Sequence, residues 1–193
     1  MFHSVPNVNS ARLIYTVGPS GAGKDSLLAW LRLNMPAQFN LHFAQRSITR
    51  AVQADGEVHE SIDVETFRLL RESNAFALHW TANGLHYGVR HAELLPLQHD
   101  RWVIVNGSRA YFAQAQSKFP ELRVLNISAS KETLRQRLEA RGRETPDAIE
   151  SRIERAVSLS VSPQTSFIEI CNNGRLDAAG RRLIDSLGDW ITM

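Results

Sequence analysis

The residue pattern that most clearly indicates chemistry is a glycine-rich loop between an apolar run and a helix-like run. The spacing Gly-x4-Gly-Lys, which ends at Lys24, is that of a phosphate-binding P-loop. Its glycines let backbone N–H groups turn toward a phosphate, the helix start adds its positive dipole end, and the lysine reaches the outer phosphates. An ordinary strand-to-helix turn is the alternative, but both flanks have the character that the motif demands. The residues expected to bind ATP are Gly18, Pro19, Ser20, Gly21, Ala22, Gly23, Lys24, Asp25 and Ser26.

One residue departs from the P-loop pattern. Asp25 stands where a Ser or Thr ordinarily offers its hydroxyl to magnesium. Ser26 does not replace that hydroxyl, because the next helical residue points about 100° away around the axis. A carboxylate suits Mg²⁺ directly or through a water, so we expect ATP and Mg²⁺ as cofactors and Asp25 as the metal-binding residue. The alternative is an acid that only complements the helix N-terminus.

A second group of cations lies in two helix-like segments separated by Gly142. Arg137, Arg141 and Arg152 belong to this group. Phosphoryl transfer needs charge neutralisation and exclusion of water, so an arginine-rich helical lid over about residues 137–152 suits a kinase. A solvated helical hairpin with Arg–Glu pairs is the alternative.

Alternating strands and helices are expected to position these residues. The periodicity of apolar residues predicts strands at 12–17, 41–44, 76–80, 85–89, 102–105, 122–127 and 167–171, and helices at 24–33, 64–72, 91–97, 109–118, 130–141, 145–159 and 176–190. Residues 45–61 form a polar stretch with no expected strand. This order favours a three-layer α/β/α fold with a parallel core sheet. Ligands of such sheets bind at the carboxyl ends of the strands, where the P-loop and Asn106 both fall.

Composition narrows the class of protein. A chain of 193 residues with 43% hydrophobic residues suits one α/β domain, and its single cysteine, Cys171, excludes a disulfide framework. No apolar run approaches membrane-spanning length and the N-terminus shows no secretory pattern, so we expect a cytoplasmic enzyme without a membrane partner. The sequence leaves open whether it is a monomer or a homodimer.

The basic residues point to phosphorylated small molecules. Only three of the 22 are lysines, and arginine grips phosphate oxygens in pairs, although a genomic preference for arginine codons is an equal alternative. No basic run is interleaved with aromatic residues, so a nucleic-acid partner is not expected.

Over nearly its whole length the chain resembles the guanylate-kinase family. The matching residues are Gly18 to Lys24, Ser47 to Arg50 with Gly56 and Glu57, Phe76 to Gly88, Arg137 to Gly142 with Arg152, and Asn172. The resemblance implies one P-loop kinase domain of the nucleoside-monophosphate-kinase type, with its core at 11–44 and 90–193 and an acceptor-binding lobe at about 45–89. It also implies the following roles: Lys24, Arg137, Arg141 and Arg152 in catalysis, Arg50 and Tyr87 on the acceptor phosphate, and Asn172 near the adenine.

Departures from that family change the expected acceptor. Leu78 stands where guanylate kinases carry a guanine-reading Glu, and Asn106 and Ser108 replace acidic residues after the central strand. Gln53 takes the place of a second phosphate-binding arginine. A site without the acidic side chains that hydrogen-bond guanine binds this base poorly, so GMP is not the expected acceptor.

The departures themselves resemble the ribose 1,5-bisphosphate phosphokinases of bacterial phosphonate breakdown by the C–P lyase route. The segments that carry this resemblance are Gly18 to Ser26, Gly56 to His59, Leu78 to Trp80 and Val105 to Arg109. It implies ATP-dependent phosphorylation of ribose 1,5-bisphosphate to 5-phosphoribosyl 1-diphosphate. A sugar bisphosphate needs cations and hydroxyl partners, and the expected acceptor-binding residues are Arg46, Arg50, Glu57, His59, His79, Tyr87, Asn106 and Arg109.

Two of these residues and the chain as a whole have alternative interpretations. His79 has the alternative of a hydrogen-bonded core histidine, and Tyr87 that of a packed aromatic. For the whole chain, the rivals are a divergent guanylate kinase acting on GMP and a non-catalytic guanylate-kinase-like binding module.

Overall fold

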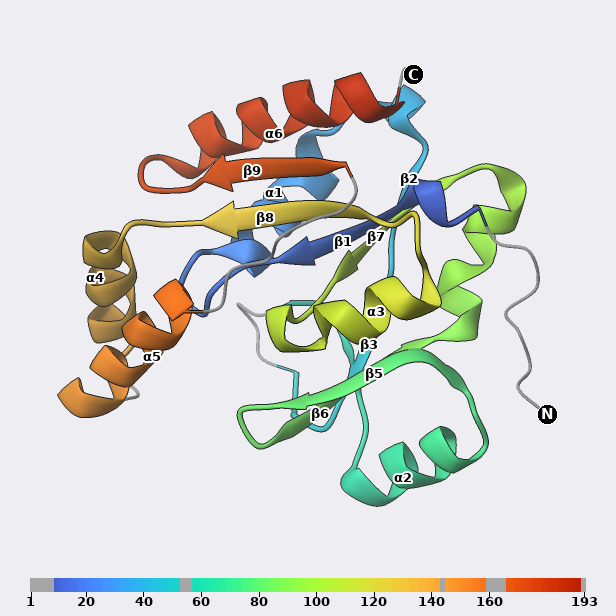
Figure 1. Ribbon diagram of the computed structural model, residues 1–193, viewed down its shortest axis with the longest axis horizontal. Coiled ribbons are helices and arrows are strands. Elements are labelled where there is room, and N and C mark those ends of the chain that lie inside the picture. Colours follow the sequence, from blue (N-terminus) through green and yellow to red (C-terminus); the bar gives the residue numbers. More distant parts are fainter. Residues whose placement is uncertain (1–8, 53–56, 143–144, 159–165, 192–193) are drawn as a thin grey trace. The chain divides into compact units, whose positions relative to one another are not determined.

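The computed structural model describes residues 9–52, 57–142, 145–158 and 166–191 (Figure 1). Gln53, Gly56 and Arg143 lie outside the described residues, as does the expected end of the helix at residue 159. The chain forms two compact units. The first comprises residues 1–15 and 40–123, and the second residues 16–39 and 124–193. The expected acceptor-binding lobe, 45–89, falls within the first unit.

Five strands form one sheet in the order β2-β7-β1-β8-β9. Their bounds are β1 Leu13–Val17, β2 Leu41–Phe43, β7 Trp102–Asn106, β8 Arg123–Ser128 and β9 Phe167–Cys171. β2 pairs in parallel with β7, and β8 pairs in parallel with β9. Every residue of β1 and of β7 is buried, as in strands that are covered on both faces. The α/β class and the parallel sheet predicted from the sequence are confirmed.

A second sheet in the first unit has the order β4-β3-β6-β5. Its strands are β3 Arg46–Ile48, β4 Glu60–Ser61, β5 Phe76–Ala82 and β6 Leu85–Arg90. Strands β5 and β6 form a hairpin, and its turn residues Asn83 and Gly84 have positive φ values of 50° and 73°. Strands β3 and β4 occupy the stretch that was expected to be merely polar. Arg46 and Ser47 are buried there because each has a carboxylate partner, Glu57 and Glu60 respectively.

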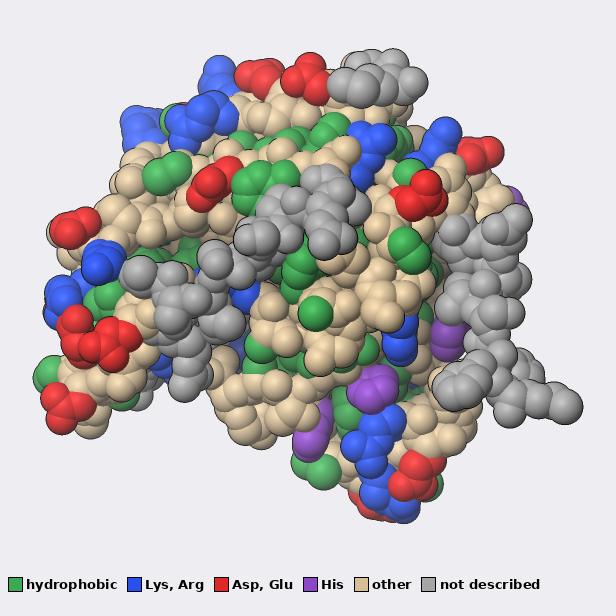
Figure 2. Space-filling model, viewed as in Figure 1, with side chains coloured by type: hydrophobic (Ala, Val, Ile, Leu, Met, Phe, Trp, Pro, Cys, Tyr) green, Lys and Arg blue, Asp and Glu red, His purple; other side chains and the backbone are tan. Residues whose placement is uncertain are grey.

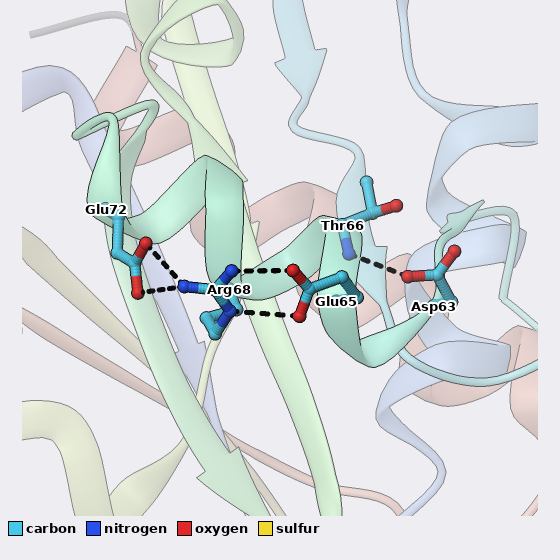
Figure 3. A network of polar contacts seen from close by, with 5 residues as sticks. All are labelled: Asp63, Glu65, Thr66, Arg68 and Glu72. Atoms are coloured by element: carbon cyan, nitrogen blue, oxygen red, sulfur yellow. Dashed lines mark hydrogen bonds and ion pairs between the residues drawn. The ribbon is translucent and has the colours of Figure 1, made fainter.

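Helix α2 (Val64–Glu72) packs on this sheet through one aromatic residue. Phe67 is buried and stacks on Phe76 and on His86, at 4.9 and 5.1 Å between ring centroids. The Asp63 side chain caps the helix by accepting a hydrogen bond from the Thr66 N–H at 2.7 Å. Figure 3 shows the exposed surface of α2, where Arg68 bonds Glu65 on one side and Glu72 on the other. The cap and the charge pairs fix where this helix begins and keep its outer face in solvent.

Some connecting helices of the first unit are tighter than the sequence indicated. Residues His91–His99 form a 3-10 helix, η3, rather than the α-helix expected at 91–97, and it contains Pro96, which lacks an N–H donor. The helix expected at 109–118 is divided into a 3-10 turn, η4 (Arg109–Tyr111), and α3 (Phe112–Lys118). Short 3-10 helices also occur at Ser10–Arg12 (η1) and, in the second unit, at Ala37–Phe39 (η2).

The second unit contains the remaining helices. These are α1 Lys24–Asn34, α4 Lys131–Arg141, α5 Pro146–Ser158 and α6 Leu176–Ile191. Figure 1 shows α6 running along β9, and the buried Leu183 and Leu187 come from this helix. Helices α4 and α5 lie side by side, joined after Gly142, whose φ of 60° ends α4. Arg135 and Glu150 bridge the pair at 2.7 Å.

On the face shown in Figure 2, Lys and Arg side chains are interspersed with Asp and Glu side chains, and no continuous basic surface is visible. Among the described residues, no helix combines the length and the apolar character that crossing a membrane requires.

Candidate functional site

The loop after β1 has the backbone that a phosphate cradle requires. Gly18 and Gly23 have φ values of 150° and 82°. A Cβ added at Gly18 would lie 2.1 Å from the Ile127 carbonyl oxygen, and one at Gly23 would lie 2.6 Å from Nδ2 of Asn172. Side chains at these positions would therefore push the loop out of shape. Helix α1 begins at Lys24, directly after the loop, so its first N–H groups are available to an anion.

The P-loop lysine rests on the loop itself. Nζ of Lys24 donates to the carbonyl oxygens of Gly18 at 2.8 Å and Pro19 at 3.2 Å. Asp25 is exposed in the first turn of α1. Within the described ranges, no three His, Cys, Asp or Glu residues gather as a metal site. The single carboxylate of Asp25 is chemically suited to Mg²⁺ that is bound together with a nucleotide, because Mg²⁺ commonly takes one or two carboxylates together with substrate phosphates and waters.

Arg137 and Asn172 hold the centre of the loop in place. Nη1 of Arg137 donates to the carbonyl oxygens of Gly21 and Ala22 at 3.3 and 3.2 Å, and its Nη2 donates to the Asn172 carbonyl at 2.8 Å. Nδ2 of the buried Asn172 donates to the Ala22 carbonyl at 2.9 Å. Two residues expected at the transferring phosphate and the adenine thus form a clamp, hereafter the P-loop clamp.

The other two candidate arginines differ in their surroundings. Nη1 of Arg152, on α5, donates to Oγ of Ser20 at 3.1 Å. Arg141 is exposed at the end of α4, and after burial its positive charge is the further cause that lowers the pKa of Arg137. The second unit therefore brings Lys24, Arg137 and Arg152 to the P-loop.

In the first unit, one face of the small sheet carries a row of aromatic rings. Tyr87 lies opposite Trp80 in the ladder, and the two rings are parallel within 4° at 5.5 Å. Trp80 also stacks on Tyr111 at 5.8 Å, and the Arg46 guanidinium lies 5.1 Å from the centre of the Tyr87 ring. We call Tyr111, Trp80 and Tyr87 the aromatic row. Trp80 is only 7% exposed, so its ring is packed against its neighbours and offers little accessible surface on which a ligand could stack.

Arg46, in β3, and Arg50, which follows this strand, differ in whether a carboxylate neutralises their charge. Arg46 is 8% exposed and makes a two-pronged ion pair with Glu57, with Nε 2.8 Å from Oε1. Its charge is thus neutralised. Arg50 differs, because its Nε is buried and finds no hydrogen-bond partner in the described part of the chain. An unsatisfied cationic N–H is costly, so Arg50 is suited to an anionic ligand.

His59 holds the main chain together rather than facing an open site. It is 4% exposed, with Nδ1 2.8 Å from the Glu57 carbonyl and Nε2 3.0 Å from the Arg50 carbonyl. Its ring thereby joins the backbone of Arg50 to that of Glu57. Burial and the use of both nitrogens give His59 a supporting place beside Arg50.

His79 lies apart from the aromatic row. It is next to Trp80 on β5, and successive strand residues point to opposite faces, so His79 is on the face that carries Phe76 and Gly88. Burial lowers the pKa of His79, and the positive charges of Lys118 and Arg71 lower it further. These surroundings disfavour the charged form of His79, and its side chain lies on the opposite face of the sheet from the ring of Tyr87.

The end of β7 supplies the remaining predicted residues and one that the sequence did not reveal. Asn106 is 5% exposed, and burial lowers the pKa of Arg109 at the start of η4. Tyr15 on β1 is fully buried, and its hydroxyl accepts from the Ser108 N–H at 3.0 Å and donates to the Ser108 carbonyl at 3.2 Å. A tyrosine inside a largely apolar strand was the available signal, because a buried phenol needs a polar partner.

Comparison with known proteins places the chain among kinases. No protein-family model matches it. It is 40% identical to ribose 1,5-bisphosphate phosphokinase PhnN of Pseudomonas paraeruginosa, over 93% of this chain and 96% of that protein. It is 45% identical to ribose 1,5-bisphosphate phosphokinase PhnN of Janthinobacterium sp. over 93% of this chain, but it spans only 39% of that protein's length. Among solved structures, guanylate kinase from Anaplasma phagocytophilum has the same fold, with a TM-score of 0.64, 16% identity, and coverage of 92% of this chain and 84% of that one.

Proposed function

We propose that this chain, which belongs to the ribose 1,5-bisphosphate phosphokinase family, transfers the γ-phosphoryl group of ATP to ribose 1,5-bisphosphate. The products would be 5-phosphoribosyl 1-diphosphate and ADP. The observation that carries the proposal is the 40% identity along almost all of the Pseudomonas relative. The glycine cradle suits the phosphates of a donor, and the Nε of Arg50, which finds no hydrogen-bond partner among the described residues, suits a phosphate of an acceptor.

The reaction makes few demands on protein acid–base chemistry. An oxygen of the 1-phosphate forms a bond to the γ-phosphorus, while the bond between that phosphorus and the β–γ bridging oxygen breaks. ADP leaves with the electron pair. The attacking phosphate is already ionised, so no general base is needed, and catalysis depends on positioning and on charge neutralisation.

The second unit is proposed to bind the donor. The P-loop amides and Lys24 hold the β and γ phosphates, and the ammonium group, which donates to the Gly18 carbonyl, has three N–H donors to divide between the loop and the nucleotide. Arg141 and Arg152 neutralise charge on the transferring group, while Arg137 acts mainly through the P-loop clamp. Mg²⁺, when bound with ATP through Asp25, supplies further charge neutralisation.

The first unit is proposed to bind the acceptor. Arg50 binds a phosphate, with Tyr87, Asn106 and Arg109 as further contacts. Arg46, Glu57 and His59 support Arg50 by fixing the chain on either side of it. Leu78 is fully buried and has no hydrogen-bonding group to read a nucleobase, which favours a base-free acceptor.

An acceptor comparison tests this function. Purified protein with ATP and Mg²⁺ is expected to release ADP with ribose 1,5-bisphosphate at a kcat/KM at least about a hundredfold above that with GMP. A Lys24→Met variant serves as the control for contaminating kinases and should lose nearly all ADP release. ADP release with GMP but not with the sugar bisphosphate would show a guanylate kinase instead. Absence of ATP binding in calorimetry would indicate a binding module.

The remaining proposals concern the protein's surroundings. We propose that it works in the cytoplasm on small molecules, with no nucleic-acid or membrane partner, as a monomer or a homodimer. Sedimentation of the purified protein with and without ATP would determine its oligomeric state.

A further inference from the structure

We propose that Tyr15 is a positioning residue of the acceptor site, and that its hydroxyl sets the conformation of the segment Asn106–Arg109. This inference rests on the proposed function, because it assigns Asn106 and Arg109 to the acceptor. Tyr15 acts through the main chain of Ser108 and does not touch the substrate.

The Tyr15 hydroxyl uses both of its hydrogen-bonding capacities on one residue. It accepts from the Ser108 N–H at 3.0 Å and donates to the Ser108 carbonyl at 3.2 Å. Burial raises the pKa of the Tyr15 hydroxyl, so the proton needed for the second bond stays in place throughout the physiological range. With both main-chain groups of Ser108 held by one rigid side chain, that peptide segment has little freedom to turn.

The phenol ring restrains the preceding residue as well. A Cβ added at Gly107 would lie 2.2 Å from Cζ of Tyr15, so the ring lies directly against the glycine backbone. The Tyr15 ring is also 6.3 Å from that of Phe112, at the start of α3. The turn after β7 is thus held by contact at Gly107 and by hydrogen bonds at Ser108.

Ser108 connects Tyr15 to the aromatic row. The Ser108 carbonyl accepts a second hydrogen bond, from the Tyr111 N–H at 3.2 Å, which opens η4. Tyr111 stacks on Trp80, which stacks on Tyr87. One hydroxyl on β1 therefore fixes both the residues that flank Ser108 and the ring at the end of the row, all within the first unit.

The test compares two buried hydroxyls that are adjacent in sequence. Tyr15→Phe removes the hydroxyl that bonds Ser108. Thr16→Val removes a buried hydroxyl that has no hydrogen-bond partner among the described residues, on the same strand. We expect Tyr15→Phe to raise the KM for ribose 1,5-bisphosphate about tenfold and to leave the KM for ATP within about twofold. Thr16→Val should leave both KM values within about twofold.

Hydrogen exchange gives a second readout that does not depend on turnover. The Ser108 amide should be protected in the wild type, should exchange at least about tenfold faster in Tyr15→Phe, and should be unchanged in Thr16→Val. Equal acceptor KM values for Tyr15→Phe and the wild type, or a parallel rise in both KM values, would overturn the proposal, as would an unprotected Ser108 amide in the wild type. If the wild type instead used GMP, the proposed function would fail, and the same comparison with GMP as acceptor would still decide the role of Tyr15.

Discussion

Arg46 and Arg50, four positions apart on the chain, show how surroundings divide similar residues between structure and binding. Both were predicted to bind the acceptor, because the sequence shows only that each carries a positive charge. In the structure Arg46 is paired with Glu57, whereas Nε of Arg50 has no partner in the described ranges. The difference arises from Glu57, whose pairing no local pattern predicts.

Substitution of these two arginines is expected to change different properties, which are the stability for Arg46 and the acceptor KM for Arg50. Arg46→Met leaves the Glu57 carboxylate, which is 15% exposed, without its partner, and should lower the free energy of unfolding by about 3 kcal/mol. The double variant Arg46→Met/Glu57→Met should recover most of that loss. Arg50→Met should leave stability nearly unchanged and raise the acceptor KM at least about tenfold. Urea unfolding and initial rates measure the two effects. An Arg50→Met variant with a normal acceptor KM would remove Arg50 from the site.

Substitution of Asp25 separates two candidate roles of its carboxylate, which are the binding of Mg²⁺ and the stabilisation of the start of helix α1. If its carboxylate binds Mg²⁺, both Asp25→Ala and Asp25→Asn should shift the magnesium titration of activity about tenfold upward, because neither retains the charge. Asp25 lies in the first turn of α1, after the N-cap Gly23, so a role limited to the helix N-terminus would lower stability in both variants and leave the magnesium titration unchanged. Magnesium titrations that match the wild type in both variants would contradict the metal role.

At the scale of elements, the predicted helices and strands were largely confirmed where the pattern was local. The periodicity identified α1, α2 and α6 and the buried strands β1 and β7. Strands β3 and β4 were missed because all of their residues except Ile48 are polar, and the burial of Arg46 and Ser47 in β3 depends on partners 11 to 13 positions away. The 3-10 form of η3 was missed because Pro96 interrupts a pattern that otherwise suits an α-helix.

The P-loop clamp could not be predicted from the sequence either, because it joins α4, the P-loop and the segment after β9. It leads to a prediction for this element. Arg137→Ala should raise the KM for ATP about tenfold and leave the acceptor KM unchanged, because it frees the Gly21 and Ala22 carbonyls.

Arg135→Ala is the matched control on the same helix. Its partner is Glu150 on the surface, so both KM values should stay within about twofold. A fall in kcat at unchanged ATP KM for Arg137→Ala would instead assign this residue to the transferring phosphoryl group.

At the scale of the whole molecule, the chain divides its proposed task between two units. The second unit holds the P-loop, Lys24 and the clamp, and the first holds Arg50, the aromatic row and the Tyr15 contact to Ser108. The sequence indicated the donor half well, because a P-loop is a contiguous motif. It indicated the acceptor half mainly through resemblance, since His59 and His79 show no local sign of their different places. The guanylate-kinase fold alone does not decide the acceptor, because one fold serves many substrates.

The identity of the phosphoryl acceptor is the central claim, and phosphorus NMR of the reaction mixture tests it most directly. With ATP, Mg²⁺ and ribose 1,5-bisphosphate, the resonance of the 1-phosphate should be replaced by two mutually coupled resonances of a diphosphate. The 5-phosphate resonance should persist while ATP is converted to ADP. A Lys24→Met sample should show neither change. An unaltered 1-phosphate resonance in the wild-type sample, together with conversion of GMP to GDP under the same conditions, would contradict the account.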